Sequence, residues 1–137
     1  MPASVVVDAS VAAKCFLSEA GSEAARRLAR SGLVLIAPDL ILIELASVAA
    51  KKVRRAELTL DAGARMTMRA ADLFDELAPV QPLLEQAYRL ASQFPLSLYD
   101  SLYLCLAERR GLELITADRK LVGAAAAGLG AHVRLLV

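Results

Sequence analysis

The sequence contains one histidine, two cysteines and no tryptophan among its 137 residues. A zinc site or a Ser-His-Asp triad needs more histidine or cysteine than this, so any metal bound here must be held by oxygen. Cys15 and Cys105 both lie in apolar, helix-like stretches, which favours two small buried thiols over a disulfide or a metal pair. Aromatic residues make up only 4% of a chain that is 57% hydrophobic, so the core must consist of Ala, Leu, Val and Ile.

The chain also lacks a stretch that could cross a membrane. Its longest segment without Asp, Glu, Lys or Arg, 121–133, contains three glycines and falls short of the roughly 20 residues of a membrane helix. The N-terminus has no basic segment and reaches Asp8 early, unlike a signal peptide. We therefore expect one cytoplasmic domain over residues 1–137. The net charge of +1 argues neither for nor against nucleic acid, and the basic clusters mostly end predicted helices, where cations favour the helix dipole.

Short apolar runs alternate with helical patterns along the chain. Strands are predicted at 4–7, 33–37, 78–81, 112–117 and 132–136. Helices are predicted at 9–20, 22–30, 39–53, 58–77, 83–94, 100–110 and 119–127. Pro38 is placed in the first turn of the third helix, and Gly63 is a candidate break in the fourth. This alternation predicts a three-layer α/β/α domain with a mainly parallel sheet of about five strands.

Two aspartates bracket the stretch from Leu98 to Leu121. A helix from Asp100 to Arg110 is about 16 Å long, and the following strand covers about 20 Å in the opposite direction. Asp100 and Asp118 should therefore return to the same end of the domain. Asp8 ends the first strand, and ligands of parallel sheets bind in the crevice outside the carboxyl ends of their strands.

Each of these aspartates also has an ordinary structural explanation. Asp8 or Ser10 could cap the following helix, and Asp118 could cap the last one. Ser97 and Asp100 match a capping box.

A fourth acid, Glu44, lies in a very apolar helix soon after the second strand. The ordinary structural explanation of Glu44 is that it belongs to a solvent-facing polar stripe of the helix, together with Ser47, Lys51 and Arg55 at helical spacing. The same stripe, with an acid near the crevice and bases further along, also suits a metal site with a phosphate-binding rim.

The four acids together indicate a metal site more strongly than any one of them does alone. Buried carboxylates that share one edge repel one another, and a divalent cation removes that cost. Mg²⁺ or Mn²⁺ prefers carboxylate and water oxygens, and the chain has no softer cluster.

Four motifs in order resemble those of PIN-domain ribonucleases, specifically the toxins of VapBC-type toxin–antitoxin pairs. They are VVDASVAAKCFL at 6–17, PDLILIEL at 38–45, LYDSLYLCLA at 98–107 and LITADRKL at 114–121. The resemblance covers nearly the whole chain and implies a PIN-like fold. It also implies that the acidic metal ligands are Asp8, Glu44, Asp100 and Asp118. Thr116 and Ser10 match supporting hydroxyl positions, whereas Cys15 stands where relatives often carry a large aromatic residue.

The hypothesis is an endoribonuclease that hydrolyses RNA phosphodiester bonds with Mg²⁺ or Mn²⁺. Lys14, Arg119 and Lys120 are candidates to contact substrate phosphates. The resemblance further implies a homodimer and a cognate antitoxin whose C-terminal segment covers the acidic crevice with an arginine. Two alternatives stay open: a phosphoryl-transfer domain (a receiver or an aspartate-nucleophile phosphatase) and a non-catalytic protein-binding scaffold. Such a phosphatase would need an aspartate at position 10, where the chain has Ser10, and a receiver would need a lysine beyond the last strand.

Overall fold

The computed structural model describes residues 2–126 and 132–137 of the chain. Its five strands form one parallel sheet in the order β3-β2-β1-β4-β5. They are β1 (Ser4–Val7), β2 (Val34–Pro38), β3 (Glu76–Ala78), β4 (Glu113–Thr116) and β5 (Val133–Leu135). The predicted parallel five-stranded sheet is confirmed.

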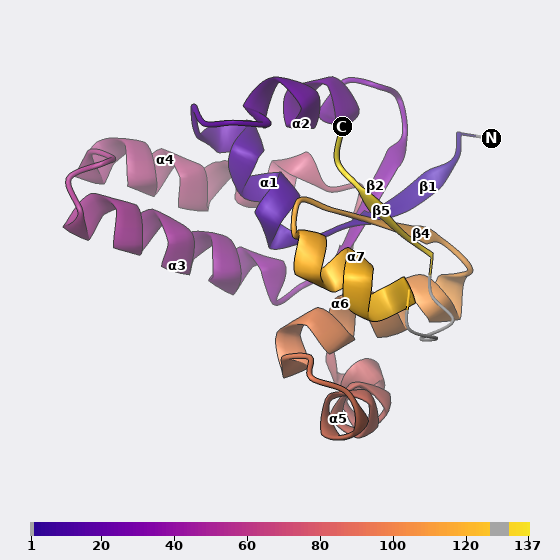
Figure 1. Ribbon diagram of the computed structural model, residues 1–137. Helices are drawn as coiled ribbons and strands as arrows, with labels where there is room; N and C mark the ends of the chain where they lie inside the picture. The colour runs from indigo at the N-terminus through magenta and orange to yellow at the C-terminus, as the bar shows by residue number, and fades with distance from the viewer. Residues whose placement is uncertain (1, 127–131) are drawn as a thin grey trace.

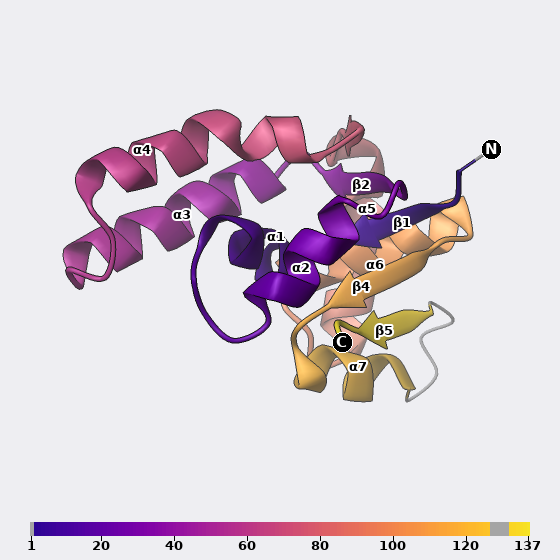
Figure 2. The same cartoon turned by 90° about the horizontal axis from the view of Figure 1, so that it is seen from above.

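Helices cover both faces of this sheet. They are α1 (Ala9–Phe16), α2 (Ser22–Ala29), α3 (Ile41–Arg54), α4 (Leu60–Arg69), α5 (Leu84–Gln93), α6 (Leu98–Arg110) and α7 (Arg119–Ala126), with short 3₁₀ turns η1 (Ala70–Leu73) and η2 (Gln81–Leu83). Figure 1 shows α2 above the sheet and α5 and α6 below it, while α3 and α4 project together to one side. Figure 2, seen from above, shows the same pair extending past the edge of the sheet. In the described part of the chain, no helix has the length and apolar content that crossing a membrane requires.

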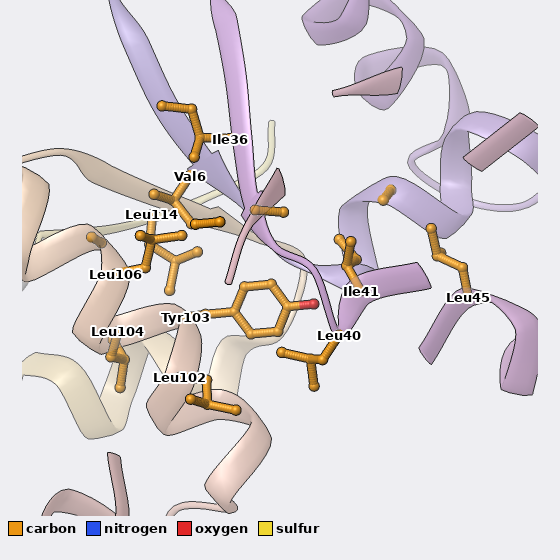
Figure 3. Close-up of a cluster of buried hydrophobic side chains, with 14 of the residues drawn as sticks. Val6, Ile36, Leu40, Ile41, Leu45, Leu102, Tyr103, Leu104, Leu106 and Leu114 are labelled. Carbon is orange, nitrogen blue, oxygen red and sulfur yellow. The ribbon is translucent and has the colours of Figure 1, made fainter. Parts of the chain in front are cut away.

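The central strand divides the core by the alternation of its side chains. Val5 and Val7 pack with residues of α1 and α2 on one face of the sheet. Val6 packs into the larger cluster on the other face, which includes residues 102–107 of α6. Figure 3 shows Tyr103 of α6 within this larger cluster, with its hydroxyl directed toward the start of α3. Residues 5–7 of β1 are buried on both faces of the sheet, which accounts for their being three successive valines.

The strand order creates a switch point between β1 and β4. From β1, the chain adds β2 and β3 on one side and then β4 and β5 on the other. The crevice beyond the carboxyl ends of parallel strands at such a point is where open α/β sheets bind ligands. Asp8 directly follows β1, and Asp118 lies two residues beyond β4. The topology therefore places both acids at the switch point.

The predictions for residues 58–81 were wrong in their boundaries. The helix ends at Arg69, and the following strand is Glu76–Ala78 instead of 78–81. The backbone N–H of Asp75 donates to the carbonyl of Leu35, and the Asp75 carboxylate accepts from the N–H of Leu35, each at 2.9 Å. These two bonds hold the start of β3 against β2. Their partners are 40 residues apart, so local periodicity gives no sign of them.

Two expectations for single residues were also wrong. Pro38 is the last residue of β2 and does not lie in the first turn of α3. Gly63 does not break α4, because it is buried at the contact with α3. A Cβ at position 63 would lie 3.1 Å from Cγ2 of Val53, so glycine there permits the close approach of the two helices. The predicted end of the last helix at Ala127 falls outside the described residues. Cys105 is buried as expected, whereas Cys15 is only partly buried.

Candidate active site at the carboxyl edge of the sheet

Asp8 is the most firmly held of the four acids. It is 5% exposed, and both of its carboxylate oxygens accept hydrogen bonds. Oδ1 accepts from the Ser10 hydroxyl at 2.6 Å and from the Val11 backbone N–H at 3.2 Å, and Oδ2 accepts from the Thr116 hydroxyl. Burial raises the pKa of Asp8, and these donors partly offset that rise because they favour the charged form. Asp8 therefore caps α1, as the structural alternative predicted, and also presents a fixed carboxylate to the crevice.

Two hydroxyls connect the ends of the two central strands. Thr116 is fully buried, and its Oγ1 also accepts from the backbone N–H of Asp118 at 3.0 Å. The Ser10 hydroxyl oxygen accepts from the backbone N–H of Ala117 at 2.9 Å. The residues after β1 and after β4 are thereby held together through Asp8. Ser10 and Thr116 thus stand in direct contact with the carboxylate that the resemblance assigns them to support.

Asp100 and Glu44 reach the same edge from two helices. The Ser97 hydroxyl oxygen accepts from the backbone N–H of Asp100 at 3.0 Å, so Ser97 caps α6 as predicted. Glu44 lies in the first turn of α3, where its Oε1 accepts from the Tyr103 hydroxyl at 2.6 Å. Both carboxyl groups are partly buried. Glu44 is therefore anchored by the core and is not a freely solvated residue of a polar stripe.

The four acids influence one another electrostatically. Burial is the largest cause that raises the pKa of Glu44, and the charges of Asp100 and Asp8 raise it further. Burial likewise raises the pKa of Asp100, with a contribution from the charge of Asp118. The charge of Asp100 also raises the pKa of Asp8. The structure therefore brings Asp8, Glu44, Asp100 and Asp118 into one field of mutual repulsion, as expected from their positions in the sequence.

These acids share an edge without meeting at a single point. Within residues 2–126 and 132–137, no three Asp, Glu, His or Cys side chains are close enough together to hold one ion between them. Their chemistry nevertheless suits a hard divalent cation, because every donor is a carboxylate oxygen. The one histidine, His132, comes just before β5 and so lies at the opposite, amino-terminal edge of the sheet.

The three residues predicted to contact phosphates differ in their surroundings. The Lys14 ammonium donates to Glu19 at 3.2 Å and to the Ala20 carbonyl at 2.8 Å, so Lys14 is already engaged. Arg119 and Lys120 are exposed at the start of α7, directly after Asp118.

Sequence reasoning missed Tyr103 as a partner of Glu44. The sequence feature that could have pointed to it is the phenol of Tyr103, one helical turn after Asp100 and within the apolar run 102–107. A tyrosine buried in a core needs a partner for its hydroxyl, and an acid on a neighbouring helix can supply one.

A parallel sheet with this strand order, helices on both faces and acids at its switch point defines a PIN-like α/β/α domain. The chain belongs to the PIN domain family, whose model matches residues 5–127. Ribonuclease VapC3 of Pyrobaculum aerophilum is 34% identical over 119 residues, which cover 85% of this chain and 91% of that protein.

Solved structures with the same fold include PAE2754 of Pyrobaculum aerophilum and a toxin-antitoxin complex from Klebsiella pneumoniae. PAE2754 superposes with a TM-score of 0.69 at 27% identity and covers 97% of this chain and 92% of its own. The chain from Klebsiella pneumoniae superposes with a TM-score of 0.60 at 18% identity and covers 95% of each chain.

Proposed function

We propose that the chain is a metal-dependent endoribonuclease and the toxin of a type II toxin–antitoxin pair. The observation that carries this proposal is the acidic switch point, where a buried, triply hydrogen-bonded Asp8 lies near three further acids. The charge of Asp100 raises the pKa of Asp8 and of Glu44, and the charge of Asp118 raises the pKa of Asp100. Natural proteins accept such repulsion at functional sites. The similarity to a protein named as a ribonuclease supports RNA as the substrate.

Asp8, Glu44, Asp100 and Asp118 would together hold one or two Mg²⁺ or Mn²⁺ ions. When bound, such an ion polarises the phosphate and lowers the pKa of a water molecule. Asp8 would supply the fixed point of the site, because its hydrogen bonds leave it little freedom to turn. Asp118 is exposed, and its Oδ1 accepts a hydrogen bond from the backbone N–H of Lys120 at 2.9 Å, so it would reach the ion from the start of α7.

Hydrolysis requires a proton acceptor for the attacking water. The water oxygen bonds to phosphorus, the bond from phosphorus to the leaving ribose oxygen breaks, and that oxygen takes up a proton from solvent. Because His132 lies at the other edge of the sheet, a carboxylate oxygen would accept the proton of the water. Arg119 and Lys120 would contact phosphates of the RNA from the start of α7.

The proposed partners are the RNA substrate, a cognate antitoxin and a second copy of this chain. The fold that the chain shares with a toxin-antitoxin complex supports the antitoxin. We propose that a C-terminal segment of the antitoxin covers the acidic crevice with an arginine, which would neutralise the repelling carboxylates.

A cleavage assay on a mixed RNA pool tests this function. Wild-type protein with Mn²⁺ should cut the pool, whereas wild-type protein with EDTA and Asp100→Asn with Mn²⁺ should not. Asp61→Asn is the matched control, because Asp61 is an exposed aspartate on α4, away from the acidic edge. Equal cleavage with Mn²⁺, with EDTA and with Asp100→Asn would rule out the carboxylate–metal mechanism. Cellular toxicity that Asp8→Asn and Asp100→Asn leave unchanged would favour the protein-binding scaffold.

A further inference from the structure

A second feature adjoins the acidic edge and takes no part in the chemistry described so far. It is a cavity of about 360 Å³ between the starts of α3 and α6. Its lining includes Ile43, Glu44, Ser47, Val48, Lys51 and Tyr99. This volume lies within the range of small-molecule sites, and its mixture of apolar and polar side chains is typical of them. We call it the Tyr99 cavity.

Tyr99 stands out among the three tyrosines of the chain. Tyr103 is buried and holds Glu44, and Tyr88 is exposed on α5. Tyr99 directly precedes Asp100 and is 57% exposed, so its ring adds little to the core. Ile43, across the cavity on α3, is 74% exposed. An aromatic ring and an aliphatic side chain left in water beside a reaction centre indicate a surface that a ligand covers.

The charges around the cavity indicate the kind of ligand. Lys51 is exposed and belongs to none of the ion pairs formed within the described residues. A neighbouring cavity of about 430 Å³ shares the walls Ala9 and Val48 and contains Lys14 and Lys52. Both of those lysines pair with Glu19, so their charge is largely neutralised. Of the three lysines that line these two cavities, Lys51 is therefore the one whose charge no ion pair within the described residues neutralises.

From this arrangement we propose that the Tyr99 cavity binds one nucleotide of single-stranded RNA next to the phosphate that is cut. The Tyr99 ring stacks on the base, and the Lys51 ammonium pairs with a backbone phosphate. This inference rests on the proposed ribonuclease function. Single-stranded RNA is commonly bound by this combination of an aromatic platform and a lysine, because every base presents a flat π-face.

The position of Glu44 places the nucleotide relative to the reaction. Glu44 lines the cavity and is also one of the four acids. Tyr99 and Asp100 are likewise consecutive in the chain. A ligand in the cavity therefore adjoins the reacting phosphate on one side. The subsite would select an unpaired base at this position, because a base inside a duplex cannot present its face to the ring.

An abasic scan tests the subsite. A ten-nucleotide RNA is made with an abasic residue at each position in turn, and its binding is measured by fluorescence anisotropy with Mg²⁺ in an Asp118→Asn background, where cleavage is absent. We expect one abasic position to weaken binding by roughly 5- to 150-fold, which is the range for loss of one base–aromatic stack. Adding Tyr99→Ala should weaken binding of the intact RNA by the same factor and remove the effect of that abasic position. Tyr99→Trp should restore both.

Matched controls separate the subsite from general effects. Tyr88→Ala removes another exposed tyrosine and should leave binding and cleavage unchanged. Lys51→Gln should reduce the slope of log Kd against log salt by about 0.7, which corresponds to one phosphate contact on a single strand. Arg65→Gln removes the same unit of charge from α4 and should leave that slope unchanged. In the cleavage assay, Tyr99→Ala should raise KM more than it lowers kcat, because stacking is present before and during the reaction.

The outcomes distinguish this inference from the function on which it rests. RNA that wild-type protein neither binds nor cuts refutes both. RNA that wild-type protein and Tyr99→Ala cut with equal KM, or an abasic profile that Tyr99→Ala leaves unaltered, refutes the subsite alone. A Tyr99→Ala protein that keeps normal RNA binding but loses affinity for a co-purifying partner protein would also refute it, and would assign the ring to a protein contact. Circular dichroism of Tyr99→Ala and Tyr99→Trp verifies that each variant is folded.

Discussion

Replacing Thr116 with valine tests how much the hydrogen bonds of the Thr116 hydroxyl contribute to stability, apart from the packing of its side chain. Valine has nearly the same shape as threonine and keeps the contacts of the buried side chain. It removes the hydroxyl that donates to Asp8 Oδ2 and accepts from the backbone N–H of Asp118. Asp8 is only 5% exposed, so water can replace little of the lost bond.

The expected cost follows from these two bonds. A hydrogen bond to a charged group contributes about 1.5–3 kcal/mol, and a neutral one contributes about 1 kcal/mol. The Asp118 amide is near the surface and recovers part of its share from water. We therefore expect Thr116→Val to lower the free energy of unfolding by about 2–4 kcal/mol at pH 7. For a domain of this size, that corresponds to a decrease in Tm of roughly 10 °C.

Thr116→Ser is the matched variant, because it keeps the hydroxyl and loses one methyl group. Its cost should be about 1 kcal/mol, the scale for one buried methylene-sized group. Urea unfolding followed by circular dichroism at pH 7 without metal measures both variants. Thr67→Val, on the exposed side of α4, controls for the threonine-to-valine change itself and should alter stability by less than about 0.5 kcal/mol. A Thr116→Val protein as stable as Thr116→Ser would refute the reasoning, because packing would then outweigh the hydroxyl.

Three further predictions concern charge, thiols and helix packing. Asp100→Asn should raise stability at pH 7 by about 1 kcal/mol or less, because it removes a carboxylate that burial and Asp118 push toward the neutral form. An acid whose pKa is raised in the folded state costs stability above that pKa and costs nothing below its ordinary value, so the gain should vanish in urea titrations near pH 3.5. A thiol reagent at pH 8 should label the partly buried Cys15 first and reach Cys105 only on unfolding, since Cys105 is fully buried and burial raises its pKa to about 11; equal labelling in mass spectra would contradict this. Gly63→Leu should destabilise the protein by about 1–3 kcal/mol in thermal unfolding, because its Cβ would lie only 3.1 Å from Cγ2 of Val53 on α3, and an unchanged Tm would show that Val53 or α4 shifts freely.

Many elements of the fold could be predicted from local sequence patterns. The β-branched run before Asp8 and the Gly111 turn after α6 define their elements without knowledge of the rest of the chain. The region from 58 to 81 does not, because β3 begins where Asp75 exchanges hydrogen bonds with Leu35, 40 residues away. Such a contact overrides a helical pattern, and a single sequence gives no sign of it.

Some residues of the candidate site could likewise be predicted from local patterns, and others could not. A rule about strand ends in parallel sheets was enough to predict that Asp8 and Asp118 share one edge. The hydrogen bond from Tyr103 to Glu44 could not be predicted, because the two residues are 59 positions apart and the apolar run around Tyr103 does not show which acid its hydroxyl will meet. Lys14 was named as a phosphate contact from its place in a motif, and its engagement with Glu19 depends on how the chain turns after α1.

The pairing of the first strand with the fourth has a consequence for how the protein is made. Asp8 and the threonine that holds it are 108 residues apart in sequence, and β1 borders both β2 and β4 in the finished sheet. A ribosome adds about 5–20 residues per second, so Asp8 emerges several seconds before its partner exists. Until then, β1 lacks β4 as a neighbour, and Asp8 lacks the donor to its Oδ2. The acidic edge is therefore assembled only after β4 has been made, and a nascent chain that stops before β4 carries no assembled site.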